Sequence, residues 1–333
     1  MRRPLSIRLA AILLGLGLVL GVGGGITYAA FTSTTSNSNP TLTSAADWVA
    51  PTASAAIIAR QPTGYYGSFI HQNGSYKIYA NVSDTGNPAS GVNTVTANAS
   101  NVTTGQTAVS LTTGGCPCSV EGTNYGYRSA ALTSNSPLSA GSKTFSITST
   151  DVAGNSGTDN GFSVTVDNTV PAGSDVQTAN ASSGTAGKAE TNDTITYTFS
   201  EIMDPDAFVS GWDGTGSKTV TVRIVNKGGA ANNDSLEVWD SANTTQLPLG
   251  SLDLGGKNYV SGNVNFNSST MTIQGGGTQV KITLGTASPS GSVGTEATAA
   301  NMVWTPAAGA QDRAGNACST ANVTESGAAN LEF

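Results

Sequence analysis

Two nearly identical five-residue segments carry the groups in this chain that are best suited to binding chemistry. Asp151-Val152-Ala153-Gly154-Asn155 recurs in the second half of the chain as Asp312-Arg313-Ala314-Gly315-Asn316. In each segment the aspartate can accept backbone N–H bonds, and Gly-Asn supplies the positive φ angles that a tight hairpin requires. We call these segments the DxAGN turns. Their recurrence indicates two domains of related design.

Calcium is the ligand that the carboxylates near these turns suggest. Ca²⁺ takes about 6 to 8 oxygens, which Asp side chains, Asn carbonyls and turn backbone carbonyls can supply. At the joint between two domains such an ion would neutralise like charges and fix the interdomain angle. Because Asp and Asn are also ordinary β-turn residues, the simpler interpretation that each one caps a turn is favoured, and no other cofactor is expected. The candidate ligands are Asp84, Asp151, Asp167, Asn168, Asp204 and Asp206.

The groups that catalysis would need are scarce. His71 is the single histidine, it stands beside a predicted Asn-Gly hairpin, and no G-x-S-x-G segment accompanies it. Glu201, Asp204 and Asp206 form the densest acidic group, but their Asp-Pro-Asp spacing suits a turn better than the opposed acid and base of a glycosidase. We therefore predict that the protein is not an enzyme.

The three cysteines, Cys116, Cys118 and Cys318, leave one over after any pairing. An exported protein would expose them to an oxidising compartment. Cys116 and Cys118 could close only a strained small ring, whereas either one paired with Cys318 would join the two domains. Unpaired cysteines are favoured, and both pairings stay open.

The four tryptophans allow a second binding hypothesis. Trp212, Trp239 and Trp304, with Trp48 near the N-terminus, could form a platform on which sugars stack. Only 6% of the residues are aromatic, so these large side chains are more simply explained as the cores of small sandwiches.

The N-terminus has the pattern of an export signal. Arginines at positions 2, 3 and 8 flank an apolar run from Leu9 to Val22, and small residues follow up to Ala30. We predict a signal peptide over residues 1–29 and a flexible lead-in over residues 30–50, rich in Ser, Thr and Asn. The alternative is an uncleaved anchor, because the stretch from Leu9 to Ala30 is long enough to span a bilayer.

Composition and periodicity favour an all-β protein that does not bind nucleic acid. The net charge is −7 and only 11% of residues are charged, so phosphate contacts have no basic stripe on which to form. Apolar residues alternate with period two at Tyr76–Val82, Phe162–Val166, Ile195–Phe199 and Val280–Leu284. A proline at position 171 blocks further pairing after one such strand, which places a domain boundary there.

The motifs also resemble a known family. Residues 193–205, which read DTITYTFSEIMDP, and the second DxAGN turn are similar to bacterial Ig-like domains of S-layer proteins and surface adhesins. Residues 83–84, 90–92 and the first DxAGN turn resemble related modules, and residues 166–171, VDNTVP, resemble their usual connection. Residues 30–35, AFTSTT, resemble the leaders of bacterial surface and matrix-fibre proteins that a specialised signal peptidase processes.

This resemblance implies two tandem Ig-like Greek-key β-sandwiches, over residues 51–168 and 169–333, behind the signal segment. We expect a secreted or surface-displayed, non-catalytic structural or adhesive module of the bacterial cell envelope. The alternative is a carbohydrate-binding accessory module of an extracellular glycan-degrading system. The expected partners are a cell-wall polymer, a host or matrix surface, or further copies of the chain, with membrane contact only through an uncleaved leader.

Overall fold

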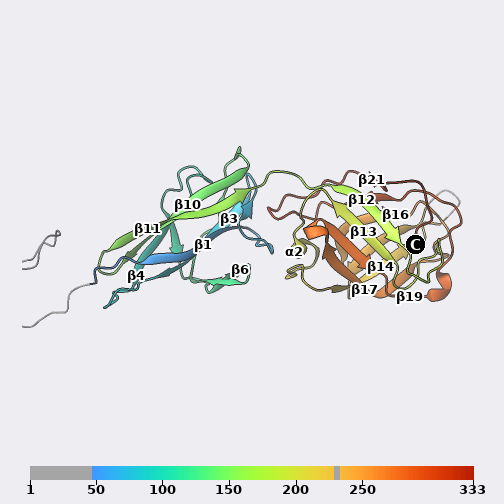
Figure 1. Ribbon diagram of the computed structural model, residues 1–333, viewed down its shortest axis with the longest axis horizontal. Helices are drawn as coiled ribbons and strands as arrows, with labels where there is room; N and C mark the ends of the chain where they lie inside the picture. Colours follow the sequence, from blue (N-terminus) through green and yellow to red (C-terminus); the bar gives the residue numbers. More distant parts are fainter. Residues whose placement is uncertain (1–46, 229–232) are drawn as a thin grey trace, which may run out of the picture. The chain divides into compact units, whose positions relative to one another are not determined.

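A computed structural model describes residues 47–228 and 233–333 (Figure 1). The predicted signal peptide and most of the predicted lead-in lie outside the described residues. Apart from one four-residue α-helix and two short 3₁₀ turns, the regular structure of the described parts is β-strand. No helix in these parts is long and apolar enough to cross a membrane.

Residues 52–166 form a first β-body around one nine-stranded sheet. Its strands follow the order β1-β3-β8-β5-β4-β10-β11-β2, with β9 paired to β3 and a separate β6–β7 hairpin beside them. Their bounds are β1 Thr52–Arg60, β2 Phe69–Ile70, β3 Ser75–Ser83, β4 Val92–Asn98, β5 Val109–Thr112, β6 Cys118–Val120, β7 Thr123–Tyr125, β8 Tyr127–Ser129, β9 Leu132–Thr133, β10 Gly141–Asp151 and β11 Ser156–Val166.

The core of the first body follows the predicted alternation. Tyr76, Ile78 and Ala80 of β3 point inward and are fully buried, while Val164 and Val166 of β11 pack in the same cluster. The first DxAGN turn connects β10 to β11 as a long antiparallel hairpin, as its sequence predicted. A second, smaller apolar cluster lies between β1, β3 and the β6–β7 hairpin.

Residues 173–324 contribute a second, larger sheet. Its order is β12-β13-β18-β17-β14-β15-β16-β20-β21, with β19 paired to β17. The bounds are β12 Gly173–Ala179, β13 Thr194–Phe199, β14 Lys218–Val225, β15 Ser235–Asp240, β16 Gln246–Asp253, β17 Val264–Gln274, β18 Gln279–Thr283, β19 Thr286–Ser288, β20 Val303–Thr305 and β21 Val323–Thr324; helix α2 spans Pro205–Phe208, and the 3₁₀ turns η1 and η2 span Gly275–Gly277 and Ser290–Ser292.

Aromatic packing fills the second core. Trp304 lies 5.1 Å from both Tyr197 and Phe199, measured between ring centroids, and Trp212 is also buried. Trp239 is half-buried under the guanidinium of Arg223. Three of the four tryptophans are thus packed against protein groups, which agrees with their interpretation as structural residues.

The two DxAGN turns need their glycines for backbone reasons. Gly154 has φ of 95° and Gly315 has φ of 90°, a region that side chains with a Cβ rarely adopt. The prediction that the following asparagines also take positive φ is wrong, because neither Asn155 nor Asn316 does so. Their side chains instead donate hydrogen bonds, as described below.

Candidate metal centres at the entry to each β-body

Three carboxylates converge where the chain enters the first body. Asp47 precedes β1, Asp84 follows β3 and Asp151 ends β10, and one oxygen from each lies within 4.8 Å of the others. Asp47 and Asp151 are buried, and Asp84 is half-buried. We call this set the entry-1 cluster. It brings two predicted calcium ligands, Asp84 and Asp151, together with one that the sequence analysis missed.

Backbone amides bind the carboxylates of Asp47 and Asp84 in the entry-1 cluster. The carboxylate of Asp47 accepts from Val49 N at 3.0 Å and from Ser90 N at 2.8 Å, and these bonds lower its pKa. Asp84 accepts from Gly86 N at 3.2 Å and Gly91 N at 2.7 Å. The N–H groups stabilise the ionised oxygens in place, so negative charge is concentrated there.

A second group, the entry-2 cluster, stands at the start of the second body. Asp167 follows β11, Glu201 follows β13 and Asp312 opens the second DxAGN turn, again with one oxygen each within 4.8 Å. Oε1 of Glu201 is buried and has no hydrogen-bond partner. Burial, and then the charge of Asp167, raises the pKa of Glu201, and burial also raises the pKa of Asp312. An added cation would therefore meet an unsatisfied acceptor.

The two clusters are built alike. In each, one carboxylate precedes the first strand of the body, one follows the strand that pairs with it, and one belongs to the DxAGN turn. The side-chain amide of Asn155 donates to the carbonyl of Asp47 at 2.8 Å, and that of Asn316 donates to the carbonyl of Asp167 at 2.9 Å. The repeated sequence thus builds a repeated three-dimensional site.

The remaining predicted ligands lie elsewhere. Asn168 accepts from Gln72 N at 2.8 Å and donates to Leu138 O at 2.7 Å. Asp206 accepts from Gly211 N at 2.6 Å, in the way expected of a turn residue. Of the six candidate ligands, Asp167 alone belongs to the second cluster, where among the described residues it meets Glu201 and Asp312. Asp312 was not among the predicted ligands, and the recurrence of the DxAGN turn is the signal that could have identified it.

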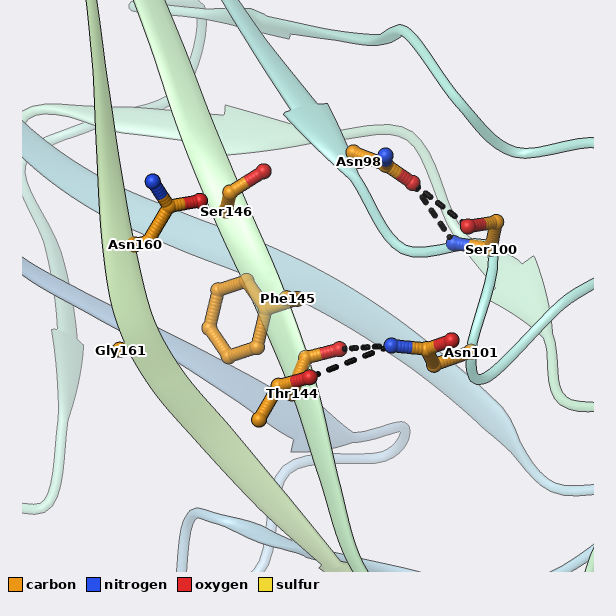
Figure 2. Close-up of a pocket in the computed structure, with 8 residues that line it drawn as sticks. All are labelled: Asn98, Ser100, Asn101, Thr144, Phe145, Ser146, Asn160 and Gly161. Carbon is orange, nitrogen blue, oxygen red and sulfur yellow. Dashed lines mark hydrogen bonds between the residues drawn. The ribbon is translucent and has the colours of Figure 1, made fainter.

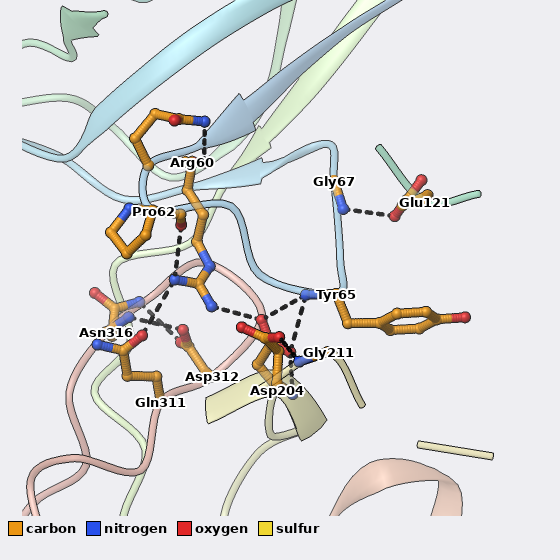
Figure 3. Close-up of polar contacts among 12 residues, drawn as sticks. Arg60, Pro62, Tyr65, Gly67, Glu121, Asp204, Gly211, Gln311, Asp312 and Asn316 are labelled. Carbon is orange, nitrogen blue, oxygen red and sulfur yellow. Dashed lines mark hydrogen bonds and ion pairs between the residues drawn. The ribbon is translucent and has the colours of Figure 1, made fainter. Parts of the chain in front are cut away.

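Asp204 belongs to a buried ion pair instead. Its Oδ2 lies 2.5 Å from a guanidinium nitrogen of Arg60, and both side chains are almost fully buried (Figure 3). Arg60 also donates to Gln311 at 3.1 Å, and Tyr65 N donates to Asp204 at 3.1 Å. Asp204 additionally caps helix α2, which forms where only a strand end and turn were expected. These contacts join the end of β1 to residues of the second sequence half.

The groups required for catalysis do not assemble around His71. Its Nδ1 lies 2.8 Å from the carbonyl of Gln72, which is a local turn contact. The hydroxyls and carboxylates of a Ser-His-Asp arrangement are not among its hydrogen-bond partners in the described parts of the chain.

A small polar hollow lies on the first body, beside the bulge between β10 and β11 (Figure 2). Its volume is about 190 Å³, less than the roughly 300 Å³ of small ligand sites. Asn98 accepts a hydrogen bond from Ser100 N, and the side-chain amide of Asn101 donates to the carbonyl of Thr144. The Phe145 ring is buried. The hollow offers no exposed aromatic face for sugar stacking. Its lining residues are Asn98, Ser100, Asn101, Thr144, Phe145, Ser146, Asn160 and Gly161.

The cysteines pair in one of the arrangements left open. Cys116 and Cys118 form a disulfide across a Cα–Cα distance of 4.5 Å, whereas Cys318 is a buried free thiol. The favoured expectation of three unpaired cysteines is therefore wrong, and so is the bridge to Cys318. The two sulfurs meet because only one residue separates the cysteines, next to a turn in which Cys116 N donates to Thr113 O, while Cys318 lies in the second core.

Comparisons with known proteins give no family for this chain. No protein-family model matches it, and no curated protein matches it. Among solved structures, dimeric latent PorU from Porphyromonas gingivalis aligns with 71% of this chain and 20% of its own, at 15% sequence identity and a TM-score of 0.20. The chain thus spans about a fifth of that protein, and a similarity at this TM-score carries no argument about fold or function.

Proposed function

We propose that this chain is a non-catalytic structural or adhesive module of a bacterial cell surface, built from two tandem Ig-like Greek-key sandwiches. The observation that carries the proposal is the duplicated carboxylate cluster at the entry to each body. A catalytic centre needs one constellation around one substrate, whereas a feature repeated at successive domain entries suits a repeating mechanical role. The export signal and the resemblance to bacterial Ig-like modules support a location outside the cell.

Calcium is the ion that best suits these clusters. Each offers three hard carboxylate oxygens, and neither contains the thiol or imidazole ligands that zinc prefers. Three negative charges within 4.8 Å repel one another unless protons or a cation offset them. Arg60 pairs with Asp204 and Lys188 pairs with Glu190, whereas the charge of Arg313 acts on Glu201 and offsets part of the negative charge of the entry-2 cluster.

A bound ion would hold the segment before each body's first strand against that body. In the entry-2 cluster Asp167 belongs to the connection between the two sheets, while Glu201 and Asp312 belong to the second body. One ion held by all three would fix the connection to that body and so stiffen it. In the entry-1 cluster Asp47 would tie the incoming chain to the first body in the same way.

Calorimetric titration of the secreted protein with Ca²⁺ tests the proposal. We expect two binding sites in the wild-type chain and one in each of the variants Asp151→Asn and Asp312→Asn. Asp206→Asn is the matched control, because Asp206 only caps a turn. We also expect a calcium-dependent rise in melting temperature and a stiffer scattering profile. Identical melting curves in calcium and in chelator would contradict the calcium mechanism.

The adhesive part of the proposal needs a separate test. The secreted protein, loaded with calcium, is incubated with purified cell-wall polymers and with a glycan array, and size-exclusion chromatography follows self-association. Binding to wall polymer or self-association supports a surface module. Turnover of any glycan on the array would contradict the non-catalytic assignment.

A further inference from the structure

Two glutamates lie in the interior of the second body, away from both entry clusters. Glu325 directly follows β21 and is 4% exposed, and Glu332 is 0% exposed. The segment that carries Glu332 returns to the body through an isolated bridge between Asn330 and Ala300. Burying two carboxyl groups is costly unless both are neutralised or hydrogen-bonded. Each buried carboxyl oxygen of this pair therefore requires a hydrogen-bond partner or a neutralising group.

One oxygen of each carboxyl has a donor, and the other has none. Oε2 of Glu325 accepts from Met302 N at 3.1 Å, and Oε2 of Glu332 accepts from Thr178 Oγ1 at 2.5 Å. Oε1 of Glu325 and Oε1 of Glu332 are both buried and lack a partner. Ionised carboxylates are acceptors only, so two such oxygens cannot satisfy each other.

A single shared proton would give both unpaired Oε1 atoms a hydrogen-bond partner. The two glutamates lie beside the same stretch of chain, because Met302 N donates to Glu325 while Ala300 pairs with Asn330, two residues before Glu332. The neighbouring carboxyl group of Glu325 raises the pKa of Glu332. If one carboxyl carries a proton, it donates to the other, and neither Oε1 is left unsatisfied. We propose that Glu325 and Glu332 share one proton in the folded protein, and that this carboxyl–carboxylate bond is a pH-sensitive latch holding residues 330–333 against the second body.

The latch holds a defined set of contacts. The backbone N–H of Glu332 donates to the Tyr259 hydroxyl at 3.0 Å, and the Phe333 ring packs edge-on against the Tyr259 ring at 6.1 Å between centroids. Phe333 also donates from its N–H to Thr178 Oγ1 at 3.3 Å and accepts from Gly187 N at 3.1 Å. Loss of the shared proton would place a second negative charge beneath these contacts.

Burial and the neighbouring carboxyl group favour the protonated form of Glu332, and the hydrogen bond from Thr178 opposes it. Burial, and then the charge of Glu325, raises the pKa of Glu332 to about 8 from its ordinary value of 4.5. Tyr259 faces the pair from the segment after β16, and the charge of Glu296 also acts at the Tyr259 hydroxyl. The folded chain therefore holds a proton that the unfolded chain releases near pH 4.5. Stability is fully present below that pH and is lost progressively as the pH rises towards about 8.

Melting of the full secreted chain between pH 5 and pH 9, in chelator, tests the latch. Glu332→Gln supplies a permanent N–H donor in place of the shared proton. We expect the wild type to lose at least about 5 °C more than this variant between pH 5 and pH 8. Glu190→Gln, at a half-buried ion pair with Lys188, is the control and should keep the wild-type pH profile.

Two further readouts keep the test decisive if Glu332→Gln fails to fold. Glu325→Gln offers the same donor from the opposite side and should also flatten the profile. Infrared spectra of the wild type at pH 7 should contain a protonated carboxylic acid band that is reduced by either glutamine variant. Wild-type and variant profiles that run parallel, or absence of that band, would overturn the proposal. The proposal would also be overturned if calcium raised the melting temperature of the wild type but not that of either glutamine variant. That result would mean that a cation, and not a proton, lies between the two carboxylates.

Discussion

The side-chain amide of Asn316 donates to the backbone carbonyl of Asp167 at 2.9 Å and so ties the second DxAGN turn to the connection between the two sheets. The same amide donates to the Asp312 carboxylate at 2.8 Å. One side chain therefore holds the connecting strand and orients a carboxylate of the entry-2 cluster. Asn155 repeats both contacts with Asp47 and Asp151 in the first body.

Replacing Asn316 should destabilise the second body. Asn316→Ala removes the donor of two hydrogen bonds and leaves buried Asp312 with fewer partners, at an expected cost of about 1 to 3 kcal/mol in the free energy of unfolding. Urea denaturation followed by tryptophan fluorescence measures the change. Asn124→Ala, at an exposed position of β7, is the control and should stay within about 0.5 kcal/mol of the wild type. Equal losses in both variants would contradict the role of the amide.

The buried ion pair between Arg60 and Asp204 gives a second prediction. Arg60→Met leaves the Asp204 carboxylate buried without its cation and should cost about 3 kcal/mol or more. Adding Asp204→Asn should recover part of that loss, since the amide removes the unpaired charge. The control is Lys188→Met, which breaks a pair that is much more solvent-accessible and should cost less than about 1 kcal/mol. Denaturant unfolding of all four proteins checks the order, and a double variant less stable than Arg60→Met would contradict it.

Calcium affinity should depend on pH differently at the two clusters. Burial raises the pKa values of Glu201 and Asp312, so the entry-2 cluster takes up protons at higher pH than isolated carboxylates do. In the entry-1 cluster, by contrast, backbone hydrogen bonds lower the pKa of Asp47. Lowering the pH from 7 to about 5 should therefore weaken calcium binding more at the entry-2 cluster.

The single-site variants separate these two affinities. Asp312→Asn retains the entry-1 cluster, and Asp151→Asn retains the entry-2 cluster. Calorimetric titration of each variant at both pH values should give the larger loss of affinity for Asp151→Asn. Equal losses would show that burial does not control proton competition at these sites.

Cys318 should be inert in the folded protein. Its thiol is buried, and burial raises its pKa to about 11, so little thiolate is present or accessible at neutral pH. Iodoacetamide at pH 8 should leave the native chain unlabelled and should label one cysteine after denaturation without reductant. Mass spectrometry counts the labels. Rapid labelling of the native protein would contradict the buried environment.

Reduction of the Cys116–Cys118 disulfide should have a small effect on stability. The bond closes a very short loop, so the chain-entropy contribution is at most about 1 to 2 kcal/mol. The double variant Cys116→Ser with Cys118→Ser should therefore melt within a few degrees of the wild type. A collapse of the melting transition in this variant would show that the bond supports the β6–β7 hairpin more than its loop length implies.

Much of the secondary structure could be predicted from the sequence alone. Period-two alternation placed Tyr76 and Ile78 of β3, and Ile195 and Tyr197 of β13, on buried faces, because alternate strand residues must face the same side of a sheet. The DxAGN turns were predictable because a positive φ restricts the residue type locally. Helix α2 was missed because its four residues are too few for a periodic pattern.

Only the tertiary structure decided which polar groups meet. Asp47, Asp84 and Asp151 stand at the ends of separate strands, and their meeting depends on strand order and register, which spacing along the chain does not specify. The Arg60–Asp204 pair and the contact between Glu325 and Glu332 depend on the same long-range arrangement. Local sequence restricts backbone geometry over a few residues, whereas the approach of distant side chains is decided when the sheets pack and their buried charges must find partners.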